Sequence, residues 1–245
     1  MSWRVTRATA RRVLTQLRHD PRTIVLLLVV PPLLLTLLKY AFDRNPAAFQ
    51  RVGGPLVGLF PFITMFLVTS ITMLRERTGG TLERLMTLPL AKLDLLVGYG
   101  IAFAIVGAIQ ALVASLVAFG LLDLEVAGST VLVAALAVAN AVLGMALGLF
   151  VSAFARTEFQ AVQFMPAVVF PQLLLCGLFV PRDEMAPVLE AVSYALPLTY
   201  AFEALRRVTV DGALGVTGAA EVGVVLAATA LALALGAATL RRRTP

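Results

Sequence analysis

Residues 126–155 read VAGSTVLVAALAVANAVLGMALGLFVSAFA, a run of 30 residues without a charged side chain. A helix that crosses a bilayer needs roughly 20 mainly apolar residues. The run therefore predicts a transmembrane helix. Its excess length predicts a helix that tilts or projects beyond the bilayer.

Five further uncharged runs flank this one, at residues 23–38, 52–74, 95–122, 159–181 and 222–240. The first run has 16 residues, and it reaches spanning length if Lys39 extends its charge to the interface and residues 40–42 complete the helix. We therefore predict an all-α polytopic membrane protein. Its six predicted spans lie at about 23–42, 52–74, 95–122, 126–155, 159–181 and 222–240, within one membrane domain over residues 23–245.

The composition supports a membrane protein and excludes several other classes. Of the 245 residues, 60% are hydrophobic and 14% are charged, whereas a soluble domain carries about 25% charged residues. Soluble and disordered chains are excluded by these values. Cys176 and His19 are the single cysteine and the single histidine. An intrachain disulfide is impossible, and we expect no metal site in this chain.

The positive charges predict the orientation in the membrane. With both termini in the cytoplasm, 14 of the 20 Lys and Arg residues fall on the cytoplasmic side. Cytoplasmic loops carry an excess of Lys and Arg. This distribution predicts six spans with both ends inside.

Residues 1–22 predict an amphipathic helix that lies on the membrane surface. In a helix, four arginines share one face and four apolar residues share another. The first set is Arg4, Arg7, Arg11 and Arg18, and the second is Ala10, Val13, Leu14 and Leu17. A solvated basic tail would not need the apolar stripe. We therefore favour an interfacial helix with its arginines near anionic headgroups.

Residues 75–89, RERTGGTLERLMTLP, connect the second and third predicted spans. Gly79 and Gly80 permit a sharp bend, Thr81 is a good N-cap, and Pro89 ends a helix. The helix would place Leu82, Leu85 and Met86 on one face and Glu83 and Arg84 on the other. It could dock into a groove of a partner protein, or it could rest on the membrane. The spacing does not decide between these two interpretations.

Three other features of the sequence give weaker predictions. Residues 191–202 are apolar but too short to span and are broken by Pro197, so they predict a re-entrant or interfacial segment. Gln110 and Asn140 lie mid-span, and we favour hydrogen bonding between helices over lining of a substrate path. Gly144 and Gly148 form a G-x-x-x-G pattern, which permits close helix packing.

Two stretches carry a resemblance to a known family. Residues 75–92 resemble the cytoplasmic loop of type 2 ABC transporter permeases, in the drug-resistance and nodulation-export branch. Residues 177–185, GLFVPRDEM, with 196–200, LPLTY, and 205–208, LRRV, resemble the outer re-entrant hairpin that precedes the last span in that branch. Both stretches stand where that branch has them.

The resemblance implies a permease of a bacterial inner membrane with both termini cytoplasmic. It would pair with a second permease subunit, identical or paralogous, and with two ATP-binding subunits that use ATP and Mg²⁺. This chain would bind no cofactor and no nucleic acid. The resemblance implies that the helix Thr81, Leu82, Glu83, Arg84, Leu85 and Met86 transmits closure of those subunits. It implies that the outer hairpin, with Pro181, Arg182, Asp183, Glu184, Pro197 and Tyr200, helps to gate release.

The residues also bear on the energy source. The chain contains no G-x-x-x-x-G-K-[ST] motif, so ATP hydrolysis would need a separate subunit. None of the uncharged runs supplies the ionisable group that an ion-coupled transporter usually needs. We expect a non-enzymatic permease subunit of an exporter of drugs, lipids or secondary metabolites. The alternatives are export of polysaccharide or a lipid-linked polymer, a membrane-embedded enzyme, and a membrane subunit without a transport path.

Overall fold

The computed structural model describes residues 3–79 and 92–239, and every regular element in this part of the chain is helical. The long helices are α1 (Trp3–Arg18), α2 (Pro21–Ala41), α3 (Pro46–Thr78), α5 (Lys92–Gly120), α6 (Thr130–Val151) and α11 (Gly215–Thr239). The shorter segments are α7 (Glu158–Phe164), η1 (Met165–Val169), α8 (Phe170–Leu175), η2 (Arg182–Glu184), α9 (Pro187–Ser193), α10 (Pro197–Arg206) and η3 (Arg207–Asp211). The predicted all-α polytopic class is confirmed.

Five helices are long and apolar enough to cross a membrane: α2, α3, α5 over Val97–Gly120, α6 and α11. They correspond to the predicted spans 23–42, 52–74, 95–122, 126–155 and 222–240, but the helices begin and end at other residues. Helices α3 and α11 extend further because a helix can continue past charged residues such as Arg51 and Glu221. Helix α6 is shorter than the uncharged run because Ser129 caps its start, where Leu132 N–H donates to Ser129 Oγ at 3.3 Å.

The remaining predicted span, 159–181, is divided into three consecutive helical segments, α7, η1 and α8. Pro166 and Pro171 lie at the starts of η1 and α8 and have no N–H to donate. The backbone adapts with a π-turn, in which Phe170 N–H donates to Met165 O. The helical stretch ends at Leu175, and Gly177 has φ +100°. That these residues cross the membrane stays a prediction.

Helix α6 packs against α3 at the centre of the bundle through the glycines of the G-x-x-x-G pattern. A Cβ on Gly144 would lie 2.2 Å from Phe62 O, and a Cβ on Gly148 would lie 2.5 Å from Phe66 O. Phe62 and Phe66 are fully buried. The two backbones therefore approach more closely than any residue with a side chain would allow.

Helix α1 packs on the first half of α5 at the start of a membrane-spanning segment. Ala10 and Val13, from the predicted apolar stripe, are 7% and 3% exposed. A Cβ on Gly98 would lie 2.6 Å from Thr9 Cβ. Part of the stripe that the sequence assigns to the membrane surface is thus covered by protein.

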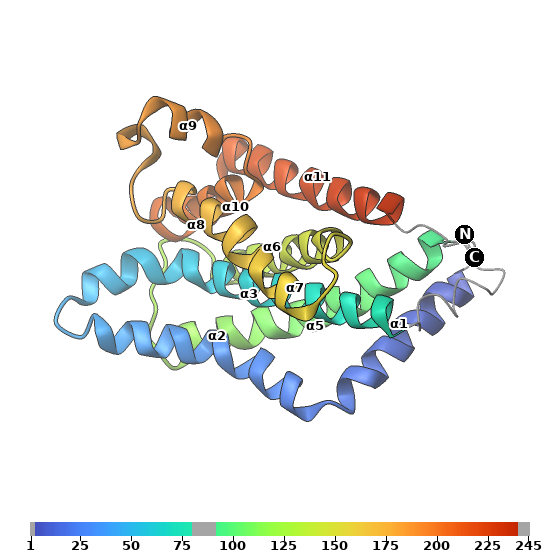
Figure 1. Ribbon diagram of the computed structural model, residues 1–245. Coiled ribbons are helices and arrows are strands. Elements are labelled where there is room, and N and C mark those ends of the chain that lie inside the picture. Colours follow the sequence, from blue (N-terminus) through green and yellow to red (C-terminus); the bar gives the residue numbers. More distant parts are fainter. Residues whose placement is uncertain (1–2, 80–91, 240–245) are drawn as a thin grey trace.

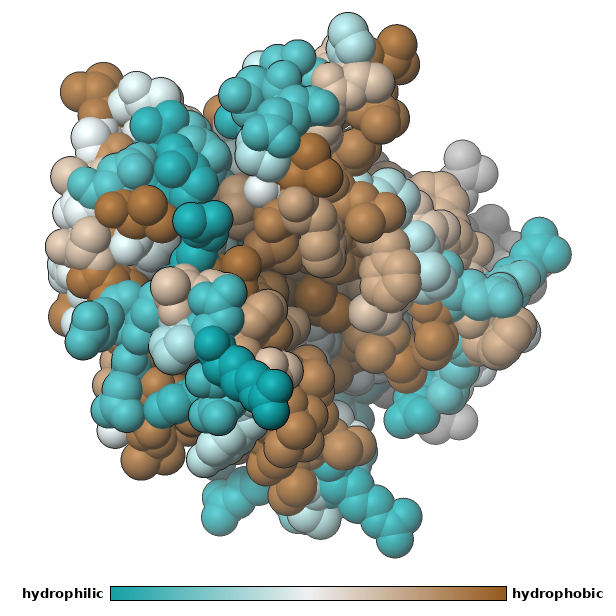
Figure 2. Space-filling model, turned by 90° about the vertical axis from the view of Figure 1, so that its left-hand side faces the viewer, coloured by the Kyte–Doolittle hydropathy of each residue, from teal (hydrophilic) through white to brown (hydrophobic). Residues whose placement is uncertain are grey.

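The long helices run side by side, and the ends of the bundle differ in character. In Figure 1, the start of α1, the end of α3 and the end of α11 lie at one end. The turn between α2 and α3, together with α9, lies at the other. Figure 2 views that second end, where hydrophilic residues gather with apolar surface between and beside them.

Candidate functional site

The residues predicted to form the coupling helix, Thr81 to Met86, lie outside the described residues. The structure does describe the end of α3, which leads into that segment, and the helices around it. Four charged side chains and the hydroxyl of Tyr99 form the α3-end cluster, which consists of Arg12, Arg75, Glu76, Tyr99 and Glu158.

Arg12 ties α1 to both α3 and α5. Its guanidinium contacts Glu76 Oε2 at 3.3 Å and donates a hydrogen bond to Tyr99 Oη. It also lies over the Tyr99 ring, 5.6 Å from the centroid. Tyr99 is 1% exposed and Glu76 is 8% exposed, so this contact is well shielded from water. A charge pair in such a place holds three helices in register.

Arg75 and Glu158 join the end of α3 to the start of α7. Arg75 Nε and one terminal nitrogen donate to the two Glu158 oxygens at 2.8 Å each. The hydrogen bond from Arg75 lowers the pKa of Glu158 below its usual value. Both side chains are more than half exposed, so the pair contributes little to stability, about 0–1 kcal/mol. Its value is positional, because it holds the start of α7 beside the end of α3.

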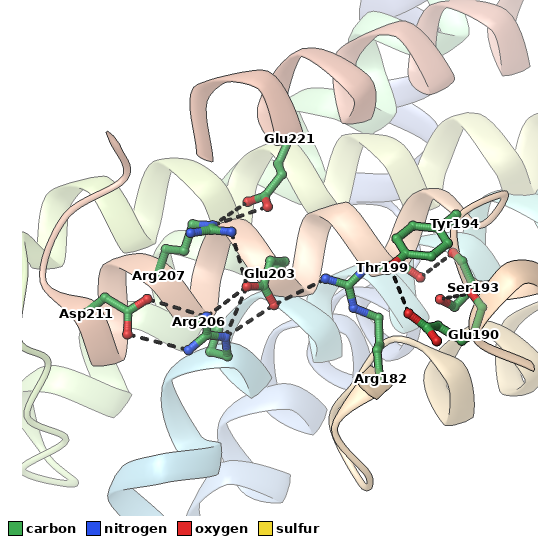
Figure 3. A network of polar contacts seen from close by, with 10 residues as sticks. All are labelled: Arg182, Glu190, Ser193, Tyr194, Thr199, Glu203, Arg206, Arg207, Asp211 and Glu221. Carbon is green, nitrogen blue, oxygen red and sulfur yellow. Dashed lines mark hydrogen bonds and ion pairs between the residues drawn. The ribbon is translucent and has the colours of Figure 1, made fainter. Parts of the chain in front are cut away.

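The second charged cluster lies before the last helix and is centred on α10. This α10 cluster consists of Arg182, Glu203, Arg206, Arg207, Asp211 and Glu221 (Figure 3). Helix α10 is short, but it packs against α3, α6, α8 and α11, and most of its residues are buried. The cluster therefore sits where a short helix enters the bundle.

Glu203 is the hub of the α10 cluster. Its carboxylate lies 2.8 Å from Arg206, 3.5 Å from Arg207 and 3.9 Å from Arg182. Arg207 continues to Glu221 of α11 at 3.1 Å. Burial raises the pKa of Glu203, but the hydrogen bond from Arg206 and the neighbouring cations outweigh it and lower that pKa overall. The ionised carboxylate thus joins Arg182, which precedes α10, to the arginines at the end of α10. Arg207 extends this network to α11.

The part of the predicted hairpin that precedes α10, residues 177–196, is held to α10 by further contacts. Arg182 lies over the Tyr194 ring, 5.3 Å from its centroid. Tyr200 Oη donates to Tyr194 O at 2.7 Å. Thr199 Oγ1 donates to Ser193 O at 2.8 Å (Figure 3). A cavity of about 430 Å³ opens between these elements, lined on its polar side by Arg182, Asp183, Glu190, Glu203 and Arg206.

The structure brings together only some of the predicted hairpin residues. Pro181, Arg182 and Asp183 line the cavity, and Tyr200 lies on α10. Glu184 ends η2 and is exposed, and Pro197 is the first residue of α10. Sequence reasoning missed Glu203, the hub. Its spacing of three and four residues from Arg206 and Arg207 is the signal that could have found it.

The two mid-span polar residues both lie between helices. Gln110 Nε2 of α5 donates to Thr64 Oγ1 of α3 at 2.6 Å. Asn140 of α6 faces Gly58 of α3, where a Cβ would lie 2.9 Å from its Nδ2. Among the described residues, that Nδ2 has no hydrogen-bond partner. Both side chains are nearly fully buried.

Apolar spans with charged clusters at the ends define a multi-pass membrane protein. The family model described as "ABC-2 type transporter" matches residues 4–210. The chain belongs to the ABC-2 type transporter family.

Individual relatives agree with this assignment. The chain is 26% identical over 216 residues to the probable multidrug ABC transporter permease YbhS of Escherichia coli, covering 86% of this chain and 56% of that protein. It is 26% identical over 210 residues to the linearmycin resistance permease protein LnrN of Bacillus subtilis, covering 83% and 52%. It is 28% identical over 170 residues to ABC transporter G family member 20 of Dictyostelium discoideum, covering 69% and 23%. The chain thus spans about half the length of these two bacterial relatives.

Proposed function

We propose that this chain is the membrane-spanning subunit of an ATP-driven exporter of lipophilic or amphipathic compounds. The carrying observation is membership of the ABC-2 type transporter family. The distribution of charge supports it, because the charged side chains of the spanning helices lie within about two turns of the helix ends. A pathway between such helices offers apolar surface and no proton relay.

The cargo class follows from the same surfaces and from the relatives. The printed names of the relatives refer to multidrug transport and to resistance to linearmycin. Drug-like amphipathic compounds partition into the bilayer and would meet the apolar faces of the spans. Drug export is accordingly proposed over polymer export.

The proposal also covers assembly and placement. Two ATP-binding subunits would use ATP and Mg²⁺ beneath two permease subunits, in a bacterial inner membrane with both termini cytoplasmic. The segment 81–86 would dock on the ATP-binding subunit. The α3-end cluster supports this arrangement because it fixes α1, α3, α5 and α7 around the point where that segment leaves α3.

Reconstitution tests the proposed function. The ATP-binding partner is first identified by co-purification in mild detergent. Vesicles that contain both proteins should move a lipophilic fluorescent dye when Mg²⁺ and ATP are supplied. Vesicles with this chain alone should show neither ATP hydrolysis nor dye movement. Dye movement driven by a proton gradient without ATP would contradict the proposal.

The proposed orientation gives a labelling prediction. Cys176 is buried and is first replaced by alanine. Single cysteines are then introduced by Asp43→Cys, in the α2–α3 turn, and Arg156→Cys, between α6 and α7, two exposed positions at opposite ends of the bundle. A membrane-impermeant thiol reagent should label position 43 in intact cells and position 156 only after permeabilisation. The reverse labelling pattern would show that the chain has the opposite orientation in the membrane.

The proposed coupling helix gives a second prediction. Glu83→Lys should leave expression and insertion unchanged, since surface substitutions usually stay within about 0.5 kcal/mol. Two like charges that face each other across an interface cost several kcal/mol of binding free energy. Each 1.4 kcal/mol corresponds to about a tenfold loss of affinity. We therefore expect weakened co-purification with the ATP-binding partner and loss of transport.

The control for that variant is Glu125→Lys, the same charge reversal at an exposed position in the α5–α6 connection. It should co-purify and transport normally. If Glu83→Lys does the same, Glu83 lies outside the docking contact, and the segment rests on the membrane instead.

A further inference from the structure

The exposed face of α1 and the neighbouring face of α5 form a groove with a basic edge and an apolar floor. A hollow of about 460 Å³ is lined by Trp3, Arg7 and Arg11 of α1 and by Ile101 and Ile105 of α5. Ile105 is 43% exposed, although it lies in a membrane-spanning helix. The floor is therefore apolar surface that protein leaves uncovered.

A second hollow continues the first. It measures about 150 Å³ and is lined almost wholly by apolar groups, including Leu17, Leu27 and Ile109. The two hollows share Leu14 and Arg18, so they adjoin. Apolar cavities of this size stay dry and accept apolar occupants. The groove thus runs from a basic rim to an apolar end.

The arginines of the rim have no partner within the described protein. Helix α1 contains five arginines and no acidic residue. Arg12 points inward to Glu76 and Tyr99. Arg7, Arg11 and Arg18 are exposed, and they form no ion pair with any residue of 3–79 or 92–239. No carboxylate is among the described residues that line either hollow. The groove carries a positive charge that an anionic group would neutralise.

The depth of the groove identifies the kind of anion. The uncharged run of α5 begins at Leu95, so Ile101 and Ile105 lie six and ten residues into it, about 9 and 15 Å along the helix axis. Residues at those depths lie below the headgroup boundary, among the acyl chains. Trp3, at the rim, is 67% exposed, and tryptophan is enriched at that boundary. A soluble acidic partner would neutralise the arginines but leave the isoleucines bare.

We propose that the α1–α5 groove binds one anionic phospholipid. Arg7 and Arg11, one helical turn apart, hold its phosphate by charge-assisted hydrogen bonds, and Arg18, where the two hollows adjoin, adds positive charge. One acyl chain lies on Ile101 and Ile105 and reaches the adjoining hollow beside Ile109. The bound lipid completes the packing of α1 on the bundle. The proposed lipid site requires that α5 spans the membrane. It does not depend on which compound the protein exports.

The test measures lipid retained by the purified full-length protein. The protein in mild detergent is mixed with equal amounts of phosphatidylglycerol and phosphatidylcholine of the same chain length, and retained lipid is counted by native mass spectrometry. We expect one phosphatidylglycerol per chain, in preference to phosphatidylcholine. An arginine near anionic lipid is worth about 1 kcal/mol, which is roughly a fivefold change in affinity. The variant Arg7→Gln with Arg11→Gln should therefore bind phosphatidylglycerol about 25-fold more weakly.

The matched control removes the same charge from the same region. Arg4→Gln with Arg22→Gln changes two exposed arginines that do not line the groove, and retention should stay within about twofold of the unmodified protein. Equal losses in both double variants would overturn the proposal in favour of general charge attraction. Equal retention of the two lipids would overturn the role of the arginines. If Arg7→Gln with Arg11→Gln keeps phosphatidylglycerol but no longer co-purifies with the ATP-binding partner, the surface is a protein interface and the proposal fails.

Discussion

Gly144→Leu should strongly destabilise the packing of α6 against α3. A single Cβ at this position would lie 2.2 Å from the backbone oxygen of Phe62, and backbone cannot move aside as a flexible side chain can. Helix α6 would have to move away from α3, its main partner in the centre of the fold. Overpacking of a tight core costs up to about 3 kcal/mol, which corresponds to a fall of roughly 6–12 °C in the melting temperature of a chain of this size. We expect little monodisperse protein after detergent extraction.

Gly223→Leu is the matched control. Gly223 lies on α11 and is exposed, and a Cβ there would meet no atom within 4 Å. Leucine also has a higher helix propensity than glycine by roughly 1 kcal/mol. This variant should extract and melt like the unmodified protein. Equal behaviour of the two variants in size-exclusion chromatography would show that the α3–α6 contact is looser than the structure has it.

Glu203→Gln should loosen the attachment of Arg182 and the residues around it to α10. Glutamine keeps the size of the side chain but removes the charge that three arginines share. The arginines are 24%, 36% and 27% exposed, so water relieves part of the loss. We expect a cost of about 3 kcal/mol, the lower end for breaking a buried ion pair. Hydrogen exchange should quicken in residues 182–206, and transport should fall.

Asp183→Asn is the control, because Asp183 lines the same cavity, is exposed, and forms no ion pair with a described residue. Its exchange pattern should not change.

The pKa of Glu203 lies below its ordinary value of 4.5, so the cluster should stay intact above about pH 4.5 and loosen only as pH falls further. Unchanged exchange in Glu203→Gln would mean that packing alone holds the hairpin.

The uncharged runs were sufficient to locate five spanning helices, because in lipid a continuous helix is the simplest structure that pairs its backbone groups. Their ends were less predictable. Charge marks where the bilayer ends, but helices end where caps and turns dictate, as Ser129 shows for α6. The run 159–181 contains three prolines, and its regular helix is interrupted at two of them, Pro166 and Pro171. Proline alone did not predict this interruption, because α2 and α3 each keep two internal prolines within one helix.

The site was less predictable than the fold. Arg182 could be named because it lies in a stretch that resembles a family motif. Glu203 lies in no such stretch: its spacing from Arg206 and Arg207 was visible in the sequence, but its pairing with Arg182 of η2 forms only in the folded chain. Likewise, Arg12 lies off the helical face shared by the other four arginines of α1, but the sequence does not show what it would meet. Its inward direction depends on Glu76 and Tyr99.

The contacts of Arg12 have a consequence for the order of biosynthesis. Glu76 follows Arg12 by 64 residues and Tyr99 follows it by 87 residues. At a synthesis rate of about 5–20 residues per second, α1 leaves the ribosome roughly 4–17 seconds before its last partner exists. Arg12 lacks Glu76 for the first 64 of those residues and lacks Tyr99 for all 87. We therefore expect α1 to stay at the bilayer surface until the third spanning helix of this chain has been synthesised and Arg12 can reach Tyr99.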